Sequence, residues 1–177
     1  MTAFHPGGIY TQYHVDRLAA QVEKYANYSL TVVEGELPGW WCKMDLFKVE
    51  GPCLYFDLDT TIIDDISPLI EIALNHRFVT LGNWNYPGRA NTGVMAWNGD
   101  MSHLYAEFNP GDISQYPGGD QDWVHDHETP IFFDELVPNM IRSYKLHVRK
   151  KGIPPECRVV AFHGNPRPWA IPELVKE

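Results

Sequence analysis

The chain contains the segment Cys53-Leu54-Tyr55-Phe56-Asp57-Leu58-Asp59-Thr60-Thr61, in which a short apolar run is followed directly by two carboxylates. The apolar run over residues 53–56 predicts a buried strand. Asp57 and Asp59 are two residues apart, so their side chains share one face of an extended chain. Carboxylate oxygens are suitable ligands for hard cations such as Mg²⁺ and Mn²⁺. We therefore expect a metal site at the end of this strand.

Apolar spacing in the rest of the chain predicts alternating helices and strands. We expect helices over residues 14–27, 41–47, 101–108 and 121–127, and a further helix that begins at Ser67-Pro68. We expect strands over residues 30–33, 53–56, 78–81, 93–97, 143–148 and 158–162, with a loop over residues 57–66. Strands that alternate with helices are typical of an α/β sandwich.

Length and composition limit the classes of protein to consider. A chain of 177 residues fits one domain, which we place over residues 1–177. The net charge of −9 opposes binding to nucleic acid unless basic side chains gather on one face. The first residues lack a basic start and an apolar run, and no stretch reaches the roughly 20 apolar residues of a membrane span. We expect a cytoplasmic protein, with Cys42, Cys53 and Cys157 as buried free thiols.

A second polar group follows an apolar run near the C-terminal end. His163-Gly164-Asn165-Pro166-Arg167 comes directly after the strand expected over residues 158–162. Gly164 lets the backbone approach a phosphate closely, and the Arg167 guanidinium can bind two phosphate oxygens. His163 can complete a metal site with the two aspartates, although a histidine before a glycine is also common in ordinary turns.

Three further positions carry side chains suited to a sugar nucleotide. The segment Gly119-Asp120-Gln121-Asp122 lies at the start of an expected helix, and helix capping explains one of its aspartates. The two carboxylates on either side of the Gln121 amide can hydrogen-bond to the hydroxyls of a sugar. Asn91 lies at the start of a strand and can meet hydroxyls of a sugar or ribose. Lys43 lies beside aromatic residues and is a candidate cation, or else an ordinary solvated lysine.

Together these segments resemble the GT-A glycosyltransferases of the glycogenin-like and lipopolysaccharide galactosyltransferase-like type, as a short member of the nucleotide-diphospho-sugar transferase superfamily. The resemblance extends from about Gly8 to Trp169. It rests on Gly8-Ile9-Tyr10 after a brief first strand, Asp57-Leu58-Asp59, Asn91-Thr92-Gly93-Val94, Gly119-Asp120-Gln121-Asp122 and His163-Gly164-Asn165-Pro166-Arg167-Pro168-Trp169. It implies a single-domain αβα sandwich of the GT-A type with a mixed, mainly parallel central sheet.

The resemblance also implies an activity and a set of roles. It implies a metal-dependent hexosyltransferase that takes a sugar from a nucleoside-diphosphate-sugar, with a UDP-sugar favoured, and retains the anomeric configuration. Asp57, Asp59 and His163 would hold Mn²⁺ or Mg²⁺, and Asp120 and Gln121 would be the catalytic residues beside the sugar. The donor-binding residues would be Gly8, Tyr10, Lys43, Asp57, Asn91, Asp122, Gly164, Arg167 and Trp169. The acceptor stays unidentified; a saccharide is favoured, and a modified nucleic-acid base is another candidate.

Two other functions fit parts of the sequence. Asp57 and Asp59 also match the D-x-D-x-T motif of haloacid-dehalogenase-type phosphatases, in which the first aspartate attacks phosphate. That assignment leaves His163 and Arg167 without a role. The second alternative is a module that binds a nucleotide-sugar without turnover. The basic segment over residues 144–151 can reach phosphates, although we expect it to be a solvated strand edge.

Overall fold

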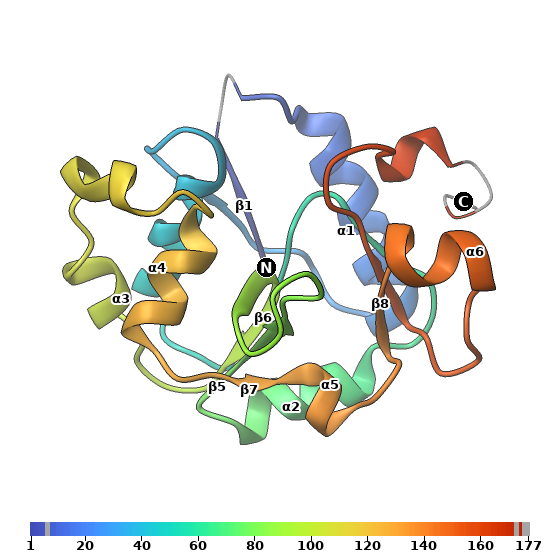
Figure 1. Cartoon of the computed structure of the whole chain (residues 1–177). Helices are drawn as coiled ribbons and strands as arrows, with labels where there is room; N and C mark the ends of the chain where they lie inside the picture. Colours follow the sequence, from blue (N-terminus) through green and yellow to red (C-terminus); the bar gives the residue numbers. More distant parts are fainter. Residues whose placement is uncertain (6–7, 172–173, 175–177) are drawn as a thin grey trace.

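The computed structural model describes residues 1–5, 8–171 and 174 (Figure 1), and in this part of the chain the strands form three sheets. The first sheet pairs β1 (Thr2–Phe4) with β2 (Val32–Glu34). The second has the order β3 (Cys53–Phe56), β6 (Ala90–Trp97), β5 (Phe78–Gly82) and β7 (Ile131–Phe132). The third has the order β4 (Thr60–Ile62), β9 (Val159–Ala161) and β8 (Ile141–Ser143). Pairs β1–β2, β5–β7 and β8–β9 are parallel, while β3–β6, β5–β6 and β4–β9 are antiparallel, so the strand pairing is mixed.

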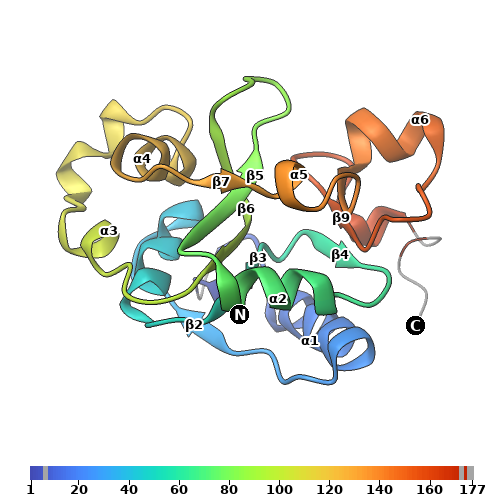
Figure 2. The same ribbon diagram turned by 90° about the horizontal axis from the view of Figure 1, so that it is seen from below.

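Helices lie on both faces of these strands. Figure 2 shows α1 and α2 on one side of the strands and α4 and α5 on the other. The longer helical segments are α1 (Gln12–Ala26), the 3₁₀ helix η1 (Gly39–Lys48), α2 (Ser67–Asn75) and α4 (Asp120–His127). The shorter ones are α3 (His103–Ala106), η2 (Pro110–Gln115), α5 (Phe133–Leu136), the π-helix η3 (Tyr144–Val148), α6 (Arg149–Lys151) and η4 (Pro168–Ala170). Among the described residues, no helix has both the length and the apolar character that crossing a membrane requires.

The core consists of two large apolar clusters separated by the central strands. On β6, Val94 and Ala96 belong to the cluster beneath α1 and α2, whereas Met95 and Trp97 belong to the cluster beneath η1, α3 and α4. These four side chains are fully buried, as the two-residue period of a strand covered on both faces requires. The predicted αβα sandwich with mixed strand pairing is therefore confirmed. The central sheet is not mainly parallel, because β6 pairs antiparallel with both β3 and β5.

The register of the strands brings the polar segments to one edge. Phe56 on β3 is paired with Val94 on β6, and the Asp57 N–H donates to the Gly93 carbonyl at 2.9 Å, so the carboxylates come next to Asn91–Gly93. Thr60 on β4 is paired with Ala161 on β9 in antiparallel register. Asp59 therefore lies beside the point where the chain leaves β9 toward His163.

Two sequence predictions about local structure are wrong. The loop expected over residues 57–66 contains β4, because Thr60, Thr61 and Ile62 favour extended backbone and find a partner in β9. The strand expected over residues 143–148 ends at Ser143 and becomes the π-helix η3. The Ser143 hydroxyl accepts the Leu146 N–H at 3.2 Å and caps this helix, so the basic segment is helical and not a strand edge.

Candidate active site

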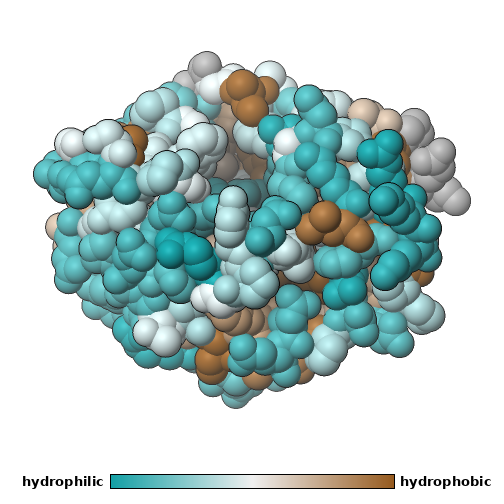
Figure 3. All heavy atoms as spheres, in the orientation of Figure 1, coloured by the Kyte–Doolittle hydropathy of each residue, from teal (hydrophilic) through white to brown (hydrophobic). Residues whose placement is uncertain are grey.

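The polar segments meet in one cavity of about 650 Å³. Figure 3 shows the surface hollowed near the middle of this face of the molecule. Most of the residues singled out from the sequence line the cavity: Gly8, Tyr10, Lys43, Asp57, Asp59, Asn91, Asp120, Gln121, His163, Gly164 and Arg167. These residues come from segments far apart in the chain, so folding gathers what the sequence separates.

Lys43 lies between the buried carboxylate of Asp120 and the partly buried carboxylate of Asp57 at the floor of the cavity. Its Nζ is 3.0 Å from Asp57 Oδ1 and 3.2 Å from Asp120 Oδ2, and both Lys43 and Asp120 are buried. The Tyr55 hydroxyl donates to Asp57 and the Thr92 hydroxyl donates to Asp120. Burial raises the pKa of Asp120 and opposes the effect of Lys43. Burial alone would lower the pKa of Lys43, but Asp120 and Asp57 outweigh it and raise that pKa, so the ammonium stays charged.

Asp59 is paired with Arg167 across the cavity. Arg167 Nη1 donates to Asp59 Oδ2 and to the Tyr10 hydroxyl, the latter at 3.0 Å. Burial, helped by the charge of Asp57 and opposed by Arg167, raises the pKa of Asp59 to about 6. From α1, buried Arg17 Nη2 donates to the carbonyls of Leu58 and Thr60 at 2.8 and 2.6 Å. The turn that carries Asp59 is thus held by the scaffold.

His163 lines the same cavity and has a partner of its own. Its Nε2 is 2.7 Å from the Ser143 hydroxyl, and its ring centroid is 5.9 Å from that of Trp84. Burial and the charge of Lys145 lower the pKa of His163, which favours the neutral imidazole that metal ions bind. In residues 1–5, 8–171 and 174, no three His, Cys, Asp or Glu side chains are gathered closely enough to hold a metal ion as they stand.

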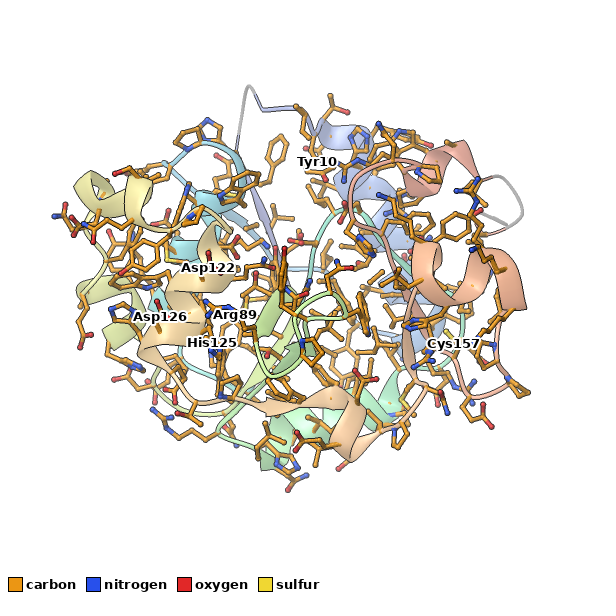
Figure 4. The ribbon with its side chains drawn as sticks, viewed as in Figure 1. Tyr10, Arg89, Asp122, His125, Asp126 and Cys157 are labelled. Carbon is orange, nitrogen blue, oxygen red and sulfur yellow. The ribbon has the colours of Figure 1, made fainter. Side chains whose placement is uncertain are left out.

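The start of α4 places Asp120 and Gln121 toward the cavity and Asp122 away from it. Gly119 has a φ of +81°, and a Cβ there would lie 2.5 Å from Trp40 Nε1, so this turn requires glycine. Asp122 accepts the Gly118 N–H at 2.7 Å and is 3.2 Å from Arg89 Nη2. Figure 4 shows Arg89, Asp122 and Asp126 lying close together on that side of the molecule. Asp122 therefore fixes the turn that presents Gln121.

Trp169 also lies outside the cavity lining. Its ring packs against His14 with a centroid distance of 4.3 Å and against Tyr10 at 6.2 Å. Trp169 thereby supports Tyr10, which does line the cavity. Its expected contact with the donor stays a prediction, as does that of Asp122.

Three functional side chains escaped the sequence analysis. Tyr55 and Thr92 hold the carboxylates, and Ser143 holds His163. Tyr55 lies two residues before its partner Asp57, where a hydroxyl beside a carboxylate is a usable signal. Thr92 lies within a motif already singled out, but its partner Asp120 is 28 residues away. Ser143 has no such signal, because it is 20 residues from its partner.

The fold is that of known glycosyltransferases. No protein-family model matches the sequence, and no curated protein matches it. A crystal structure of the galactosyltransferase LgtC in complex with donor and acceptor sugar analogues aligns with a TM-score of 0.63 at 13% identity, over 95% of this chain and 88% of LgtC. The glycosyltransferase GlyE of Streptococcus pneumoniae TIGR4 aligns with a TM-score of 0.58 at 13% identity, over 92% of this chain and 47% of GlyE. The chain therefore has a GT-A-like glycosyltransferase fold.

Proposed function

We propose that this protein is a metal-dependent glycosyltransferase that uses a nucleoside-diphosphate-sugar, with a UDP-sugar favoured, and retains the anomeric configuration. The observation that carries the proposal is the convergence of Asp57, Asp59, Asp120, Gln121, His163, Gly164 and Arg167 on one cavity. LgtC, which has the same fold, binds donor and acceptor sugar analogues. The cavity combines carboxylates for a metal ion with cations for phosphates, which is what a diphosphate donor requires.

The side chains present are chemically suited to Mn²⁺ or Mg²⁺. Asp57 and Asp59 repel each other, and their repulsion contributes to the raised pKa of Asp59, so a cation between them is favoured. His163 lines the same cavity as a neutral imidazole. We assign these three side chains to the metal, which when bound would act as a Lewis acid toward the donor diphosphate.

Transfer breaks the bond between the anomeric carbon and the phosphate oxygen, and the electron pair of that bond leaves with the diphosphate. The acceptor hydroxyl supplies the oxygen of the new bond to the anomeric carbon, and its proton is released to solvent. Arg167 and the Gly164 N–H bind the phosphates, where they stabilise the added charge of the leaving group. Asp120 and Gln121 contact the transferred sugar, and Asn91 binds its hydroxyls. Lys43 fixes Asp120 in place through a buried ion pair and Asp57 through a partly buried one.

We favour a saccharide as the acceptor. Trp40 and Trp84 line the cavity, and Trp40 is exposed over 57% of its surface. Flat indole faces suit the apolar face of a sugar ring. A modified nucleic-acid base is the second acceptor candidate, because it too can stack on an indole.

The phosphatase alternative gains no support from the fold. Asp57 follows β3 and not the first strand. Phosphatases of that type also need a later acidic pair, for which Asp120 and Asp122 are the candidates, but Asp122 accepts the Gly118 N–H and is paired with Arg89. The alternative of binding without turnover is separated from catalysis only by assay.

The first test is thermal stabilisation of the protein by a panel of nucleotide-sugars and nucleoside diphosphates, each with and without Mn²⁺. A ligand that binds only the native state raises its stability, so the proposal requires a Mn²⁺-dependent shift with at least one base. Release of nucleoside diphosphate from that donor then measures turnover. If no ligand of the panel shifts the thermal stability, the glycosyltransferase proposal is refuted. If a donor binds but no nucleoside diphosphate is released over long incubation, the protein is a binding module.

A further inference from the structure

Lys145 lies beside the cavity although the sequence places it in a basic segment with no assigned role. A Cβ built on Gly164, whose φ is +73°, would lie 3.1 Å from Lys145 Nζ. Gly164 lines the cavity and is the residue whose N–H is assigned to the donor phosphates. The ammonium of Lys145 is thus within reach of a group bound at Gly164.

The π-helix η3 holds Lys145 in this position. Tyr144 stacks on Phe162 with a centroid distance of 4.8 Å and an interplanar angle of 13°. Ser143 contacts His163 through its hydroxyl at 2.7 Å. The two residues before Lys145 are therefore anchored to the two residues before Gly164. Short π-helical turns are frequent at functional sites, because the extra residue per turn redirects a side chain.

Lys145 is also a cation beside the cavity whose ammonium is not already paired with a carboxylate of the part of the chain that the structure describes. Lys43 is paired with Asp57 and Asp120, and Arg167 is paired with Asp59. Within the described residues, Lys145 forms neither an ion pair nor a side-chain hydrogen bond. The three negative charges of Asp57, Asp59 and Asp120 then equal the three positive charges of Lys43, Arg167 and Lys145. A divalent metal ion and a donor with one negative charge on each of its two phosphates also cancel, so the filled site is neutral. Without Lys145 the filled site carries an excess negative charge.

We propose that Lys145 binds the donor diphosphate beside Gly164, as a second phosphate-binding cation next to Arg167. This inference rests on the proposed function. When the bond from the anomeric carbon to the phosphate oxygen breaks, its electron pair stays on that oxygen and the leaving diphosphate gains one negative charge. Lys145 therefore binds the departing nucleoside diphosphate more tightly than the intact donor, and lowers the barrier to transfer.

The test measures binding of UDP with Mn²⁺, and of inorganic pyrophosphate with Mg²⁺, by titration calorimetry. Lys145→Met keeps the length of the side chain and removes its charge, and Lys145→Arg keeps the charge. We expect Lys145→Met to weaken both ligands about tenfold, equivalent to about 1.4 kcal/mol, and Lys145→Arg to recover most of that loss. Lys150 is an exposed lysine of the same basic segment. Lys150→Ala is the control and should change neither affinity by more than about twofold.

The outcomes separate this inference from the proposed function. If the unmodified protein binds neither ligand, both are wrong. If it binds them and Lys145→Met binds equally well, only the role of Lys145 is overturned. The same holds if Lys145→Met leaves both affinities unchanged and raises the KM of an acceptor, because the lysine then serves the acceptor and not the donor.

Discussion

Replacing Lys43 by methionine should destabilise the protein strongly, because it leaves Asp57 and Asp120 without their shared ammonium. Both carboxylates lie within 3.2 Å of Nζ, and Lys43 has only 6% of its surface exposed. Removing one partner of a buried ion pair costs about 3–5 kcal/mol. The cost has an upper limit, because a carboxylate left without the ammonium can take up a proton instead of staying charged. Protonating a carboxyl of ordinary pKa near 4 at pH 7 takes about 4 kcal/mol. We therefore expect a loss of about 4 kcal/mol at neutral pH.

The pH dependence of this loss identifies its cause. Without the ammonium, the pKa of buried Asp120 rises further above its value in the unfolded chain, so the folded state binds protons more tightly. The unfolding free energy of the variant must then increase as the pH falls from about 7 toward about 5. The difference from the unmodified protein should shrink over the same interval.

Equilibrium unfolding in urea at several pH values measures both quantities. Lys24→Met, which removes an exposed lysine from α1, is the matched control and should change the unfolding free energy by less than about 0.5 kcal/mol. A loss below about 1 kcal/mol for Lys43→Met, or a loss that does not shrink in acid, would show that the ammonium does not neutralise these carboxylates.

Four further predictions concern the site and the core. Asp59→Ala should abolish Mn²⁺-dependent binding of UDP while the protein stays folded; calorimetry showing unchanged binding contradicts the metal assignment. Gln121→Ala should keep UDP affinity within about twofold and lower turnover about 100-fold, since its partner is the sugar; a loss of UDP affinity would overturn that role. A Cβ on Gly35 would lie 2.5 Å from the Cys42 carbonyl oxygen, so Gly35→Ala should cost about 1–3 kcal/mol in thermal or urea unfolding, and an unchanged midpoint refutes the close packing. Burial raises the pKa of Cys42 and of Cys157 to about 11 in each case, so at about pH 8 the native protein should resist a disulfide reagent until it unfolds, and rapid labelling would contradict the burial.

Much of the fold and the site was predictable because its signals are local. The apolar run before Asp57 identifies β3, and the periodic apolar residues of α1 identify that helix. Glycines before Asp120 and after His163 mark turns at strand and helix ends, where sites of α/β proteins concentrate. These signals depend only on residues that are close in the sequence, so one sequence is enough to detect them.

The remaining features depend on contacts between distant residues. β4 exists because β9 pairs with it, and β9 begins almost 100 residues later in the chain. The π-helix η3 depends on the Ser143 hydroxyl and on stacking against Phe162. No sequence pattern predicts that Lys43 pairs with Asp57 and Asp120. For this reason the sequence identified the charged residues of the site and not their partners.

Those partners bear on how the proposed ligands bind. Arg167 is held by Asp59, and it can turn to a phosphate only when another cation takes its place on that carboxylate. A divalent metal alone competes with an internal guanidinium, and a diphosphate alone can draw Arg167 to itself only by leaving Asp59 without its partner. Each ligand removes the obstacle to the other, so the two should bind more tightly together than their separate affinities predict. If the proposed function is right, the ion pair of Asp59 with Arg167 would couple metal binding to donor binding.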